Sequence, residues 1–328
     1  MTRQSILVTG ATGLVGSNLC IIARGQGRRV RALVRSRADI EPLAAAGVEF
    51  ADGDITDPPS LDRALAGIDG IVHCAAQIGG SWSKATPEDF KRTNQDGAIN
   101  VLAAAERAGN VRTVMLSTPV VFSADETLTE DSRVQPIGPQ HSPYTRAKIA
   151  AFYETMARAA RGQDALTVIP GAIYGPAPLV DRALVPTSFN APLLLAARGE
   201  IKRYLGSQTS WGLATDVARI SLAALDKGEI GQRYLALGRP EDVDTFPGIW
   251  NRFCAMAGSP HRVEAFNPSA PGAADDKEFG TMLKYLRTSY PIPLLDCSRT
   301  TTALGVAPTP LEDGLRETLA WMRAHGKI

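Results

Sequence analysis

The sequence has few of the residues that build metal or redox sites. It contains four cysteines and four histidines in 328 residues, and no two cysteines form a CxxC pair. This spacing excludes an obvious zinc site or thiol redox motif, so no metal is expected. A disulfide framework is unusual in a chain of this length, and we expect the cysteines to pack in the core.

Neither sign of charge dominates, and long apolar runs are absent. The 35 Lys and Arg residues nearly balance 34 Asp and Glu residues, so no overall field would attract nucleic acid or an anionic membrane. No apolar stretch approaches the roughly 20 residues that span a bilayer. The first residues lead directly into an apolar strand, which leaves no room for a signal peptide. These absences predict a cytoplasmic globular protein.

Strand and helix signals alternate through the first half of the chain. Short apolar runs predict strands, and apolar residues three to four positions apart predict helices. The alternation predicts an α/β fold in which helices cover both faces of a doubly wound parallel sheet. The predicted strands are 5–9, 29–34, 70–74, 113–117 and 166–170, and the predicted helices are 14–23, 41–46, 87–108 and 143–161.

Three glycines, Gly10, Gly13 and Gly16, lie at the first strand-to-helix turn. Their spacing is GxxGxxG, whereas GxGxxG is the commoner spacing in dinucleotide-binding turns. The first would allow a tight turn, the second a close approach of a pyrophosphate, and the third close packing of helix on strand. The helix N-terminus would offer N–H donors and a positive dipole end to phosphates. The turn predicts a Rossmann-type cofactor site; the alternative is a purely structural turn.

The end of the second predicted strand bears on the choice between NAD and NADP. An acidic residue there would hold the ribose 2′-hydroxyl, whereas an arginine would accommodate a 2′-phosphate. The chain has Arg35 and Arg37, and no acid before Asp39. NADP is therefore favoured over NAD. The alternatives are that both arginines are merely solvated, or that Arg35 stacks on the adenine without discriminating.

The texture of the sequence changes after Pro170, where proline and glycine become frequent and the elements shorten. Segment 212–238 is an exception, because it carries a further helix signal and a further strand signal. We predict a dinucleotide-binding domain over residues 1–170, to which 212–238 returns. Residues 171–328 would mainly form a smaller, irregular substrate-binding lobe.

Tyr144 and Lys148 are spaced to share one face of a predicted helix. A free tyrosine titrates at about pH 10, and a nearby cation lowers that pKa. Tyr144 could then protonate an alkoxide or deprotonate an alcohol. Thr118 follows a strand at the ligand-binding edge of the predicted sheet, where its hydroxyl could orient a substrate oxygen. The alternatives are a surface Tyr–Lys pair and a threonine that caps a turn.

The glycine turn and the Tyr144-x-x-x-Lys148 pair together resemble the extended short-chain dehydrogenase/reductase family, also called the NAD-dependent epimerase/dehydratase family. The resemblance covers most of the chain. It implies a Rossmann-type fold and an NAD(P)-dependent dehydrogenase or reductase. The further similar segments are 53–57, 73–76, 93–97, 170–176, 216–218 and 309–323.

The resemblance also implies roles for individual residues. Thr118, Tyr144 and Lys148 would be the catalytic set, and Lys148 would also bond the nicotinamide ribose. Asn94 would be at most a helper, with a structural side-chain-to-backbone bond as the alternative. The implied cofactor contacts are Gly10, Thr12, Gly13, Leu14, Val15, Arg35, Asp54, Ile55, Ala75, Ala76, Tyr144, Lys148, Pro170 and Ile173.

Two departures separate the branches of this family. Its sugar dehydratases carry an acidic pair after the catalytic threonine, whereas Pro119 and Val120 follow Thr118 here, which disfavours a dehydratase. Its nucleotide-sugar epimerases usually carry an arginine that grips the diphosphate, whereas segment 206–212 has no cation. An epimerase with tightly bound NAD stays open as the alternative, because other cations could substitute. They are Arg182, Arg198, Lys202 and Arg203.

Apolar and aromatic residues around the predicted site favour a small, partly hydrophobic carbonyl or alcohol substrate, although most should belong to the core. This texture resembles the dihydroflavonol-reductase and 3β-hydroxysteroid-dehydrogenase branches.

His141 could contact the substrate or be solvated. A third hypothesis is a cofactor-binding protein without catalysis. Similar proteins often form homodimers through helices corresponding to 87–108 and 143–161, so we expect a homodimer. The apolar and aromatic residues considered around the predicted site are Ile78, Trp82, Phe122, Tyr174, Phe189 and Trp211.

Overall fold

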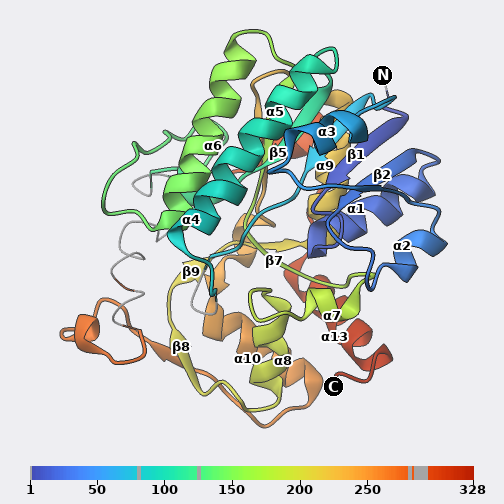
Figure 1. Cartoon of the computed structure of the whole chain (residues 1–328). Helices are drawn as coiled ribbons and strands as arrows, with labels where there is room; N and C mark the ends of the chain where they lie inside the picture. The colour runs from blue at the N-terminus through green and yellow to red at the C-terminus, as the bar shows by residue number, and fades with distance from the viewer. Residues whose placement is uncertain (1, 80–82, 124–126, 280–282, 284–294) are drawn as a thin grey trace.

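The computed structural model describes residues 2–79, 83–123, 127–279, 283 and 295–328 (Figure 1). Its centre is a seven-stranded parallel sheet with the order β11-β6-β5-β4-β1-β2-β3. The predicted doubly wound parallel sheet is confirmed. The strands are β1 (Ser5–Thr9), β2 (Arg29–Val34), β3 (Glu49–Asp52), β4 (Gly70–His73), β5 (Arg112–Leu116), β6 (Ala165–Pro170) and β11 (Arg233–Ala236).

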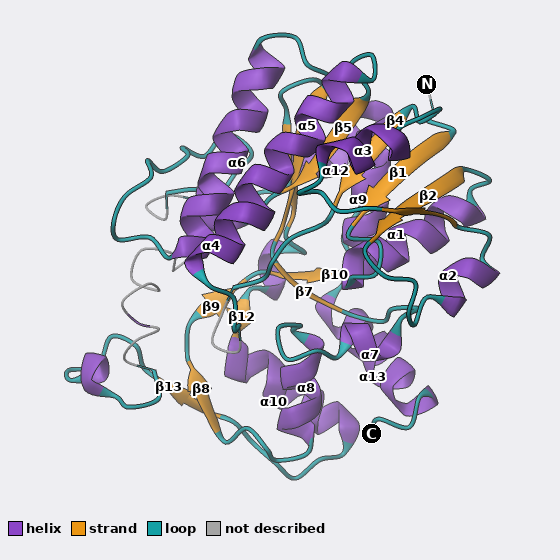
Figure 2. Ribbon diagram, viewed as in Figure 1, coloured by secondary structure: helices purple, strands orange, loops and turns teal. Residues whose placement is uncertain are grey.

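Helices cover both faces of this sheet, and the strands are apolar for that reason (Figure 2). In β1, Ile6 and Val8 pack with α1 and α9 on one face, while Leu7 packs with α3 and α5 on the other. All three side chains are fully buried. The helices of the first face are α1 (Leu14–Gly25), α9 (Ala214–Lys227) and α12 (Ser298–Leu304), and those of the second are α3 (Pro58–Ala64), α5 (Gly97–Arg107) and α6 (Pro143–Ala160).

The strand order reverses at β1, which pairs with β2 on one side and with β4 on the other. Open α/β sheets bind ligands at such a switch point, outside the carboxyl ends of the strands. The carboxyl ends of β1, β4 and β5 therefore form the edge at which a site is expected.

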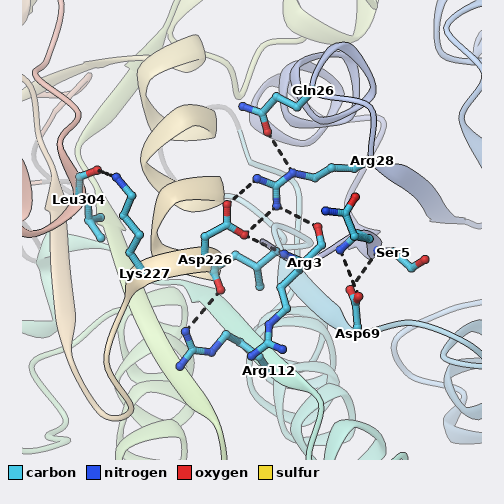
Figure 3. Close-up of polar contacts among 11 residues, drawn as sticks. Arg3, Ser5, Gln26, Arg28, Asp69, Arg112, Asp226, Lys227 and Leu304 are labelled. Atoms are coloured by element: carbon cyan, nitrogen blue, oxygen red, sulfur yellow. Dashed lines mark hydrogen bonds and ion pairs between the residues drawn. The ribbon is translucent and has the colours of Figure 1, made fainter. Parts of the chain in front are cut away.

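The opposite, amino-terminal edge of the sheet is closed by an ionic network (Figure 3). Arg28 binds Asp226 through two hydrogen bonds, Nη1 to Oδ1 at 3.0 Å and Nη2 to Oδ2 at 2.6 Å. The backbone N–H of Arg3 donates to the same Oδ1 at 3.0 Å. The Arg28 side chain is almost fully buried, and its bidentate pair fastens the start of β2 to the end of α9. The Arg3 N–H ties the chain before β1 to the same carboxylate.

The predicted helix over 87–108 is helical throughout, with a change of pitch in the middle. It consists of α4 (Pro87–Phe90), a π-helical segment η1 (Lys91–Asp96) and α5. π-helical turns are rare and frequently occur at functional sites. The sequence analysis did not predict β3 or α3, and α2 (Glu41–Ala45) lies where a helix was predicted.

The remaining elements form the lower part of the molecule in Figure 1, which we call the second lobe. Its core is aromatic, and Trp250 and Phe253 are fully buried in it. Its helices are α7 (Val180–Ala183), α8 (Asn190–Ala197), α10 (Phe246–Ala257) and α13 (Leu311–Ala324), and its strand pairs are β7 (Ala172–Tyr174) with β10 (Trp211–Leu213), β8 (Arg203–Leu205) with β13 (Glu264–Phe266), and β9 (Gln208–Thr209) with β12 (Asp244–Thr245). Short 3₁₀ segments are η2 (Pro119–Val121), η3 (Pro240–Asp242) and η4 (Ala273–Asp275).

Candidate functional site

The glycine turn lies against the segment that follows β4. Gly10 has a φ of 68°, a left-handed conformation that glycine adopts without steric cost. A Cβ on Gly10 would lie 2.5 Å from the backbone nitrogen of Ala75, and a Cβ on Gly16 would collide with the carbonyl oxygen of Gly10. These two glycines therefore allow β1, α1 and the end of β4 to approach one another closely.

The N-terminus of α1 fits the phosphates of a dinucleotide. Gly13 is its N-cap, no side chain caps it, and its first turn has no acidic residue. Gly13 is exposed, and a Cβ there would meet only the Gly10 carbonyl oxygen, at 3.3 Å. Thr12 and Leu14 are half-buried beside it, whereas Val15 is buried in the core and would offer only its N–H. An uncapped helix end of this kind favours an anion.

The two arginines after β2 have different surroundings. Arg37 binds Asp52, at the end of β3, through Nε to Oδ1 and Nη2 to Oδ2, both at 2.9 Å. Each partner stabilises the charge of the other, which raises the pKa of Arg37 and lowers the pKa of Asp52. Arg35 is exposed and has no ionic partner among the described residues. Asp52 was not identified from the sequence, because β3 was not predicted.

Asp54 and Ile55, two of the expected cofactor contacts, follow β3. Asp54 Oδ1 accepts hydrogen bonds from the N–H and the hydroxyl of Thr56, both at 2.8 Å. Ile55 is buried against α5, where a Cβ on Gly97 would collide with its side chain. The Asp54 carboxylate therefore closes a local turn, and Ile55 anchors this segment to the core.

The end of β4 contributes a buried polar pair. The Thr9 hydroxyl lies 2.7 Å from Nδ1 of His73, and Thr9 also accepts a hydrogen bond from the backbone N–H of Ala75 at 3.4 Å. Burial, assisted by the Lys148 cation, lowers the pKa of His73 to about 3, so its imidazole is neutral at physiological pH. Ala75 and Ala76 are half-buried next to it.

Lys148 projects from α6 to the end of β5. Its Nζ donates a hydrogen bond to the Leu116 carbonyl oxygen at 2.9 Å, and the side chain is buried. Burial lowers the pKa of Lys148 to about 8, although the Cys74 thiol opposes this. The cation is thus held beside the carboxyl ends of β4 and β5.

Tyr144 lies one helical turn before Lys148, in the first turn of α6. The helix begins there because Ser142 is its N-cap and accepts a hydrogen bond from the Thr145 N–H at 3.1 Å. The Tyr144 ring meets the edge of Phe90, with centroids 5.8 Å apart, and a Cβ on Gly79 would lie 3.0 Å from Tyr144 Cγ. The ring is therefore held between α4 and the chain after β4.

Two hydroxyls follow β5, and the sequence analysis placed the catalytic one on Thr118. Thr118 is half-buried and precedes η2, which it does not cap with its side chain. The neighbouring Ser117 has a buried Oγ without a hydrogen-bond partner in the part of the chain that the structure describes. Ser117 lines a small cavity with His73 and Lys148.

Several residues considered from the sequence have structural contacts instead. Asn94 Oδ1 accepts from the Gln77 N–H at 2.7 Å and its Nδ2 donates to the Gln77 carbonyl at 2.9 Å, which is the structural alternative. His141 is buried, and its Nε2 lies 2.9 Å from Gln135 Oε1, so the expectation of a solvated side chain is wrong. Trp82 lies outside the described residues.

Among the apolar residues considered for the pocket, the three most buried belong to the core: Phe122, Tyr174 and Trp211. Ile78 is exposed beside Gly79, and Phe189 is half-buried in the aromatic cluster of the second lobe.

The segment 170–176 is fixed by a residue that the sequence analysis missed. Asn190 is fully buried, and its side chain accepts from the Gly175 N–H and donates to the Gly175 carbonyl oxygen, both at 2.8 Å. Pro170 is buried at the end of β6, and Ile173 is half-buried in β7. Asn190 has no local signal in the sequence, because asparagine is common at helix starts whatever else it contacts.

Each of three cations considered for gripping a diphosphate contacts other groups of the protein. Arg203 bonds Asp276 and Glu278 and stacks over Phe266, with its guanidinium carbon 5.0 Å from the ring centroid. Arg198 donates to the carbonyl oxygen of Lys327, and Arg182 contacts the loop after β2. Lys202 is exposed.

Burial of the Lys148 cation leads to a prediction for stability. The unfolded chain keeps the Lys148 proton up to its usual pKa near 10.5, whereas the folded protein releases it at about 8. Lys148 therefore lowers the free energy of unfolding below pH 8, and this penalty fades as pH rises from about 8 to 10.5. Without cofactor, Lys148→Met should unfold with a free energy about 1–3 kcal/mol higher at pH 7.

Urea denaturation of the wild type and Lys148→Met at pH 7 and pH 10 measures this difference. Most of the difference between the two curves should disappear at pH 10, and the exposed Lys202→Met should match the wild type at both pH values. A less stable Lys148→Met at pH 7 would show that the buried ammonium is not penalised.

Within the described residues, no helix is both long and apolar enough to cross a membrane. Across the same residues, no three His, Cys, Asp or Glu side chains gather in a way that could hold a metal ion.

A family model, two related sequences and a solved structure match this chain over most of its length. The model of the family described as the NAD dependent epimerase/dehydratase family matches residues 6–236. The chain is 30% identical to the sterol demethylase protein B of Methylococcus capsulatus, over 99% of this chain and 100% of that protein. It is 28% identical to a putative dihydroflavonol 4-reductase of Synechocystis, over 98% and 95%. The crystal structure of gox2253 superposes with a TM-score of 0.83 at 26% identity, covering 99% of each chain.

Proposed function

The chain belongs to the NAD-dependent epimerase/dehydratase family, and we propose that it is an NAD(P)-dependent oxidoreductase that interconverts a hydroxyl and a carbonyl group on a small, partly hydrophobic substrate. The observation that carries this proposal is the position of Lys148. Its ammonium is held against the end of β5, beside His73 at the end of β4, and one helical turn from Tyr144.

In this proposal Tyr144 is the acid and base. When bound, the nicotinamide cofactor supplies or accepts the hydride. Tyr144 Oη gives its proton to the substrate oxygen during reduction and takes it back during oxidation. The Lys148 ammonium stabilises the phenolate that Tyr144 becomes, and the Thr118 hydroxyl orients the substrate oxygen. The tight packing of the Tyr144 ring against Phe90 and Gly79 favours a single position of the phenol.

The second lobe supports a carbonyl or alcohol substrate over a nucleotide sugar. Arg203 is neutralised by two carboxylates, so one of the cations that could grip a diphosphate is already occupied. The names of the two relatives refer to a sterol and a dihydroflavonol, both ring compounds with oxygen substituents. We infer that the domain of residues 1–170, with 212–238, holds the cofactor, and that the rest mainly holds the substrate.

We also infer that NADP is favoured over NAD. Arg35 has no ionic partner among the described residues and lies at the strand end where a 2′-phosphate would bind. Arg37 is turned to Asp52 and is a weaker candidate. The epimerase alternative requires NAD that stays bound through the cycle.

A binding and turnover assay separates these functions. We expect the purified protein to bind NADPH more tightly than NADH, and to oxidise NADPH in proportion to the alcohol formed from a panel of ketones. Tight NAD that co-purifies with the protein, together with UDP binding and no net change in cofactor absorbance, would favour the epimerase. Binding of cofactor with no turnover of any substrate would favour the non-catalytic alternative.

A further inference from the structure

An arginine of the second lobe contacts the loop that follows β2. Arg182 lies on α7, and its Nη2 donates to the Ala38 carbonyl oxygen at 3.4 Å and lies 3.6 Å from Asp39 Oδ2. The contact joins residues 144 positions apart in the sequence. In doubly wound folds this strand end faces the adenine ribose of a dinucleotide. A second-lobe cation therefore lies at the cofactor half of the molecule.

The loop is shaped to meet this arginine. Asp39 has a φ of 56°, a left-handed conformation that aspartate adopts more readily than most residues. The turn at Asp39 presents both its own carboxylate and the neighbouring Ala38 carbonyl oxygen to Arg182.

Two of the neighbouring carboxylates are paired with cations other than Arg182, so Arg182 is available to bind an anion. Asp52 is occupied by Arg37, and Asp181, next to Arg182, is occupied by Lys327 at 2.9 Å. Asp39 is the carboxylate that Arg182 faces, and 81% of its side chain is exposed. An exposed ion pair with a separation of 3.6 Å contributes little to stability, so Arg182 can exchange this partner at low cost.

A phosphate is a stronger partner for Arg182 than Asp39 is. It carries more charge than one carboxylate and accepts two parallel hydrogen bonds from a guanidinium. We propose that Arg182 is a coenzyme-selectivity residue supplied by the second lobe, and that it binds the 2′-phosphate of NADP together with Arg35. This inference rests on the NADP preference proposed above.

Two probes that differ only in the 2′-phosphate test this inference: adenosine 2′,5′-bisphosphate and 5′-AMP. Their dissociation constants are measured by calorimetry for the wild type, Arg35→Ala, Arg182→Ala and the double variant. We expect Arg182→Ala to bind the bisphosphate about 10- to 100-fold more weakly and 5′-AMP within about twofold of the wild type. Arg182→Lys should recover part of the loss.

Arg198→Ala is the matched control, because Arg198 is also a second-lobe arginine that donates to a backbone carbonyl oxygen. It should bind both probes as the wild type does. Asp39→Asn should bind the bisphosphate more tightly, since a competing negative charge is removed.

The outcomes separate the inference from the proposed function. If the wild type prefers the bisphosphate, and only Arg35→Ala loses that preference, the role of Arg182 is wrong while the NADP preference stands. If the wild type does not distinguish the probes, the 2′-phosphate site itself is wrong. The same follows if Asp39→Asn binds 5′-AMP more weakly, because Asp39 would then hold the ribose 2′-hydroxyl. The proposed chemistry at Tyr144 is then still testable with NADH.

Discussion

Tyr144→Phe should lose activity by about 10²- to 10⁴-fold while binding the cofactor within about twofold of the wild type. The substitution removes only the phenolic oxygen. The ring keeps its contacts with Phe90 and Gly79, so the first turn of α6 should keep its shape. A carbonyl that accepts a hydride without a proton donor must form an alkoxide, and this is the cost that the phenol avoids. Steady-state kcat and a separate cofactor titration measure the two effects.

Tyr153→Phe is the matched control for this experiment. Tyr153 lies on the same helix, is exposed, and donates to the carbonyl oxygens of Val134 and Gln135 at 3.4 and 3.3 Å. Its variant should turn over substrate as the wild type does. If Tyr144→Phe keeps full activity on a substrate that the wild type reduces, the proton comes from another group and the acid–base assignment is wrong.

Tyr144→Phe also distinguishes a defect in the chemistry from a defect in cofactor selectivity. Tyr144 lies on α6, whereas Arg35 and Arg182 lie at the end of β2 and on α7. A loss of turnover with unchanged binding of the bisphosphate probe would place the defect at the substrate end of the cofactor. A loss of both would indicate a disturbed fold.

The fold could be predicted to the extent that burial leaves a local pattern. Ile6, Leu7 and Val8 form an apolar run because opposite faces of β1 are both covered, and such a run is visible without the structure. β3 carries no such pattern, since its residues are half-buried or exposed. The π-helical turn at Lys91–Asp96 also has no local signal, and its buried Asn94 bonds the backbone of Gln77, a contact that only the fold brings about.

The candidate site divides in the same way. The spacing of Tyr144 and Lys148 is set by one helix and could be predicted from it. The contact of Lys148 with Leu116 spans 32 residues and follows from the packing of α6 on the sheet. The pairing of Arg37 with Asp52 and of Arg182 with Asp39 depends on elements brought together by the fold. Arg35 and Arg37 therefore looked equivalent in the sequence and differ in the structure.

The second large effect is expected at the glycine turn, where substitution of Gly13 should weaken cofactor binding and substitution of Gly16 should destabilise the fold. Gly13→Val should leave the protein folded and weaken cofactor binding by about 100-fold. Gly13 has extended backbone angles that valine can adopt, and a Cβ there meets only the Gly10 carbonyl oxygen. The added side chain would occupy the exposed space at the N-terminus of α1 that a pyrophosphate needs, and each lost hydrogen bond to a charged group costs about 1.5–3 kcal/mol.

Gly16→Ala should show the opposite behaviour, with a free energy of unfolding about 1–3 kcal/mol lower than that of the wild type. Gly16 is buried, and its Cβ would collide with the backbone of Gly10, so α1 must move away from β1. Urea denaturation without cofactor, followed by titration of the folded protein with NADPH, separates the two effects. If Gly13→Val binds NADPH normally, the turn does not approach the phosphates, and the cofactor would have to bind elsewhere on the sheet edge.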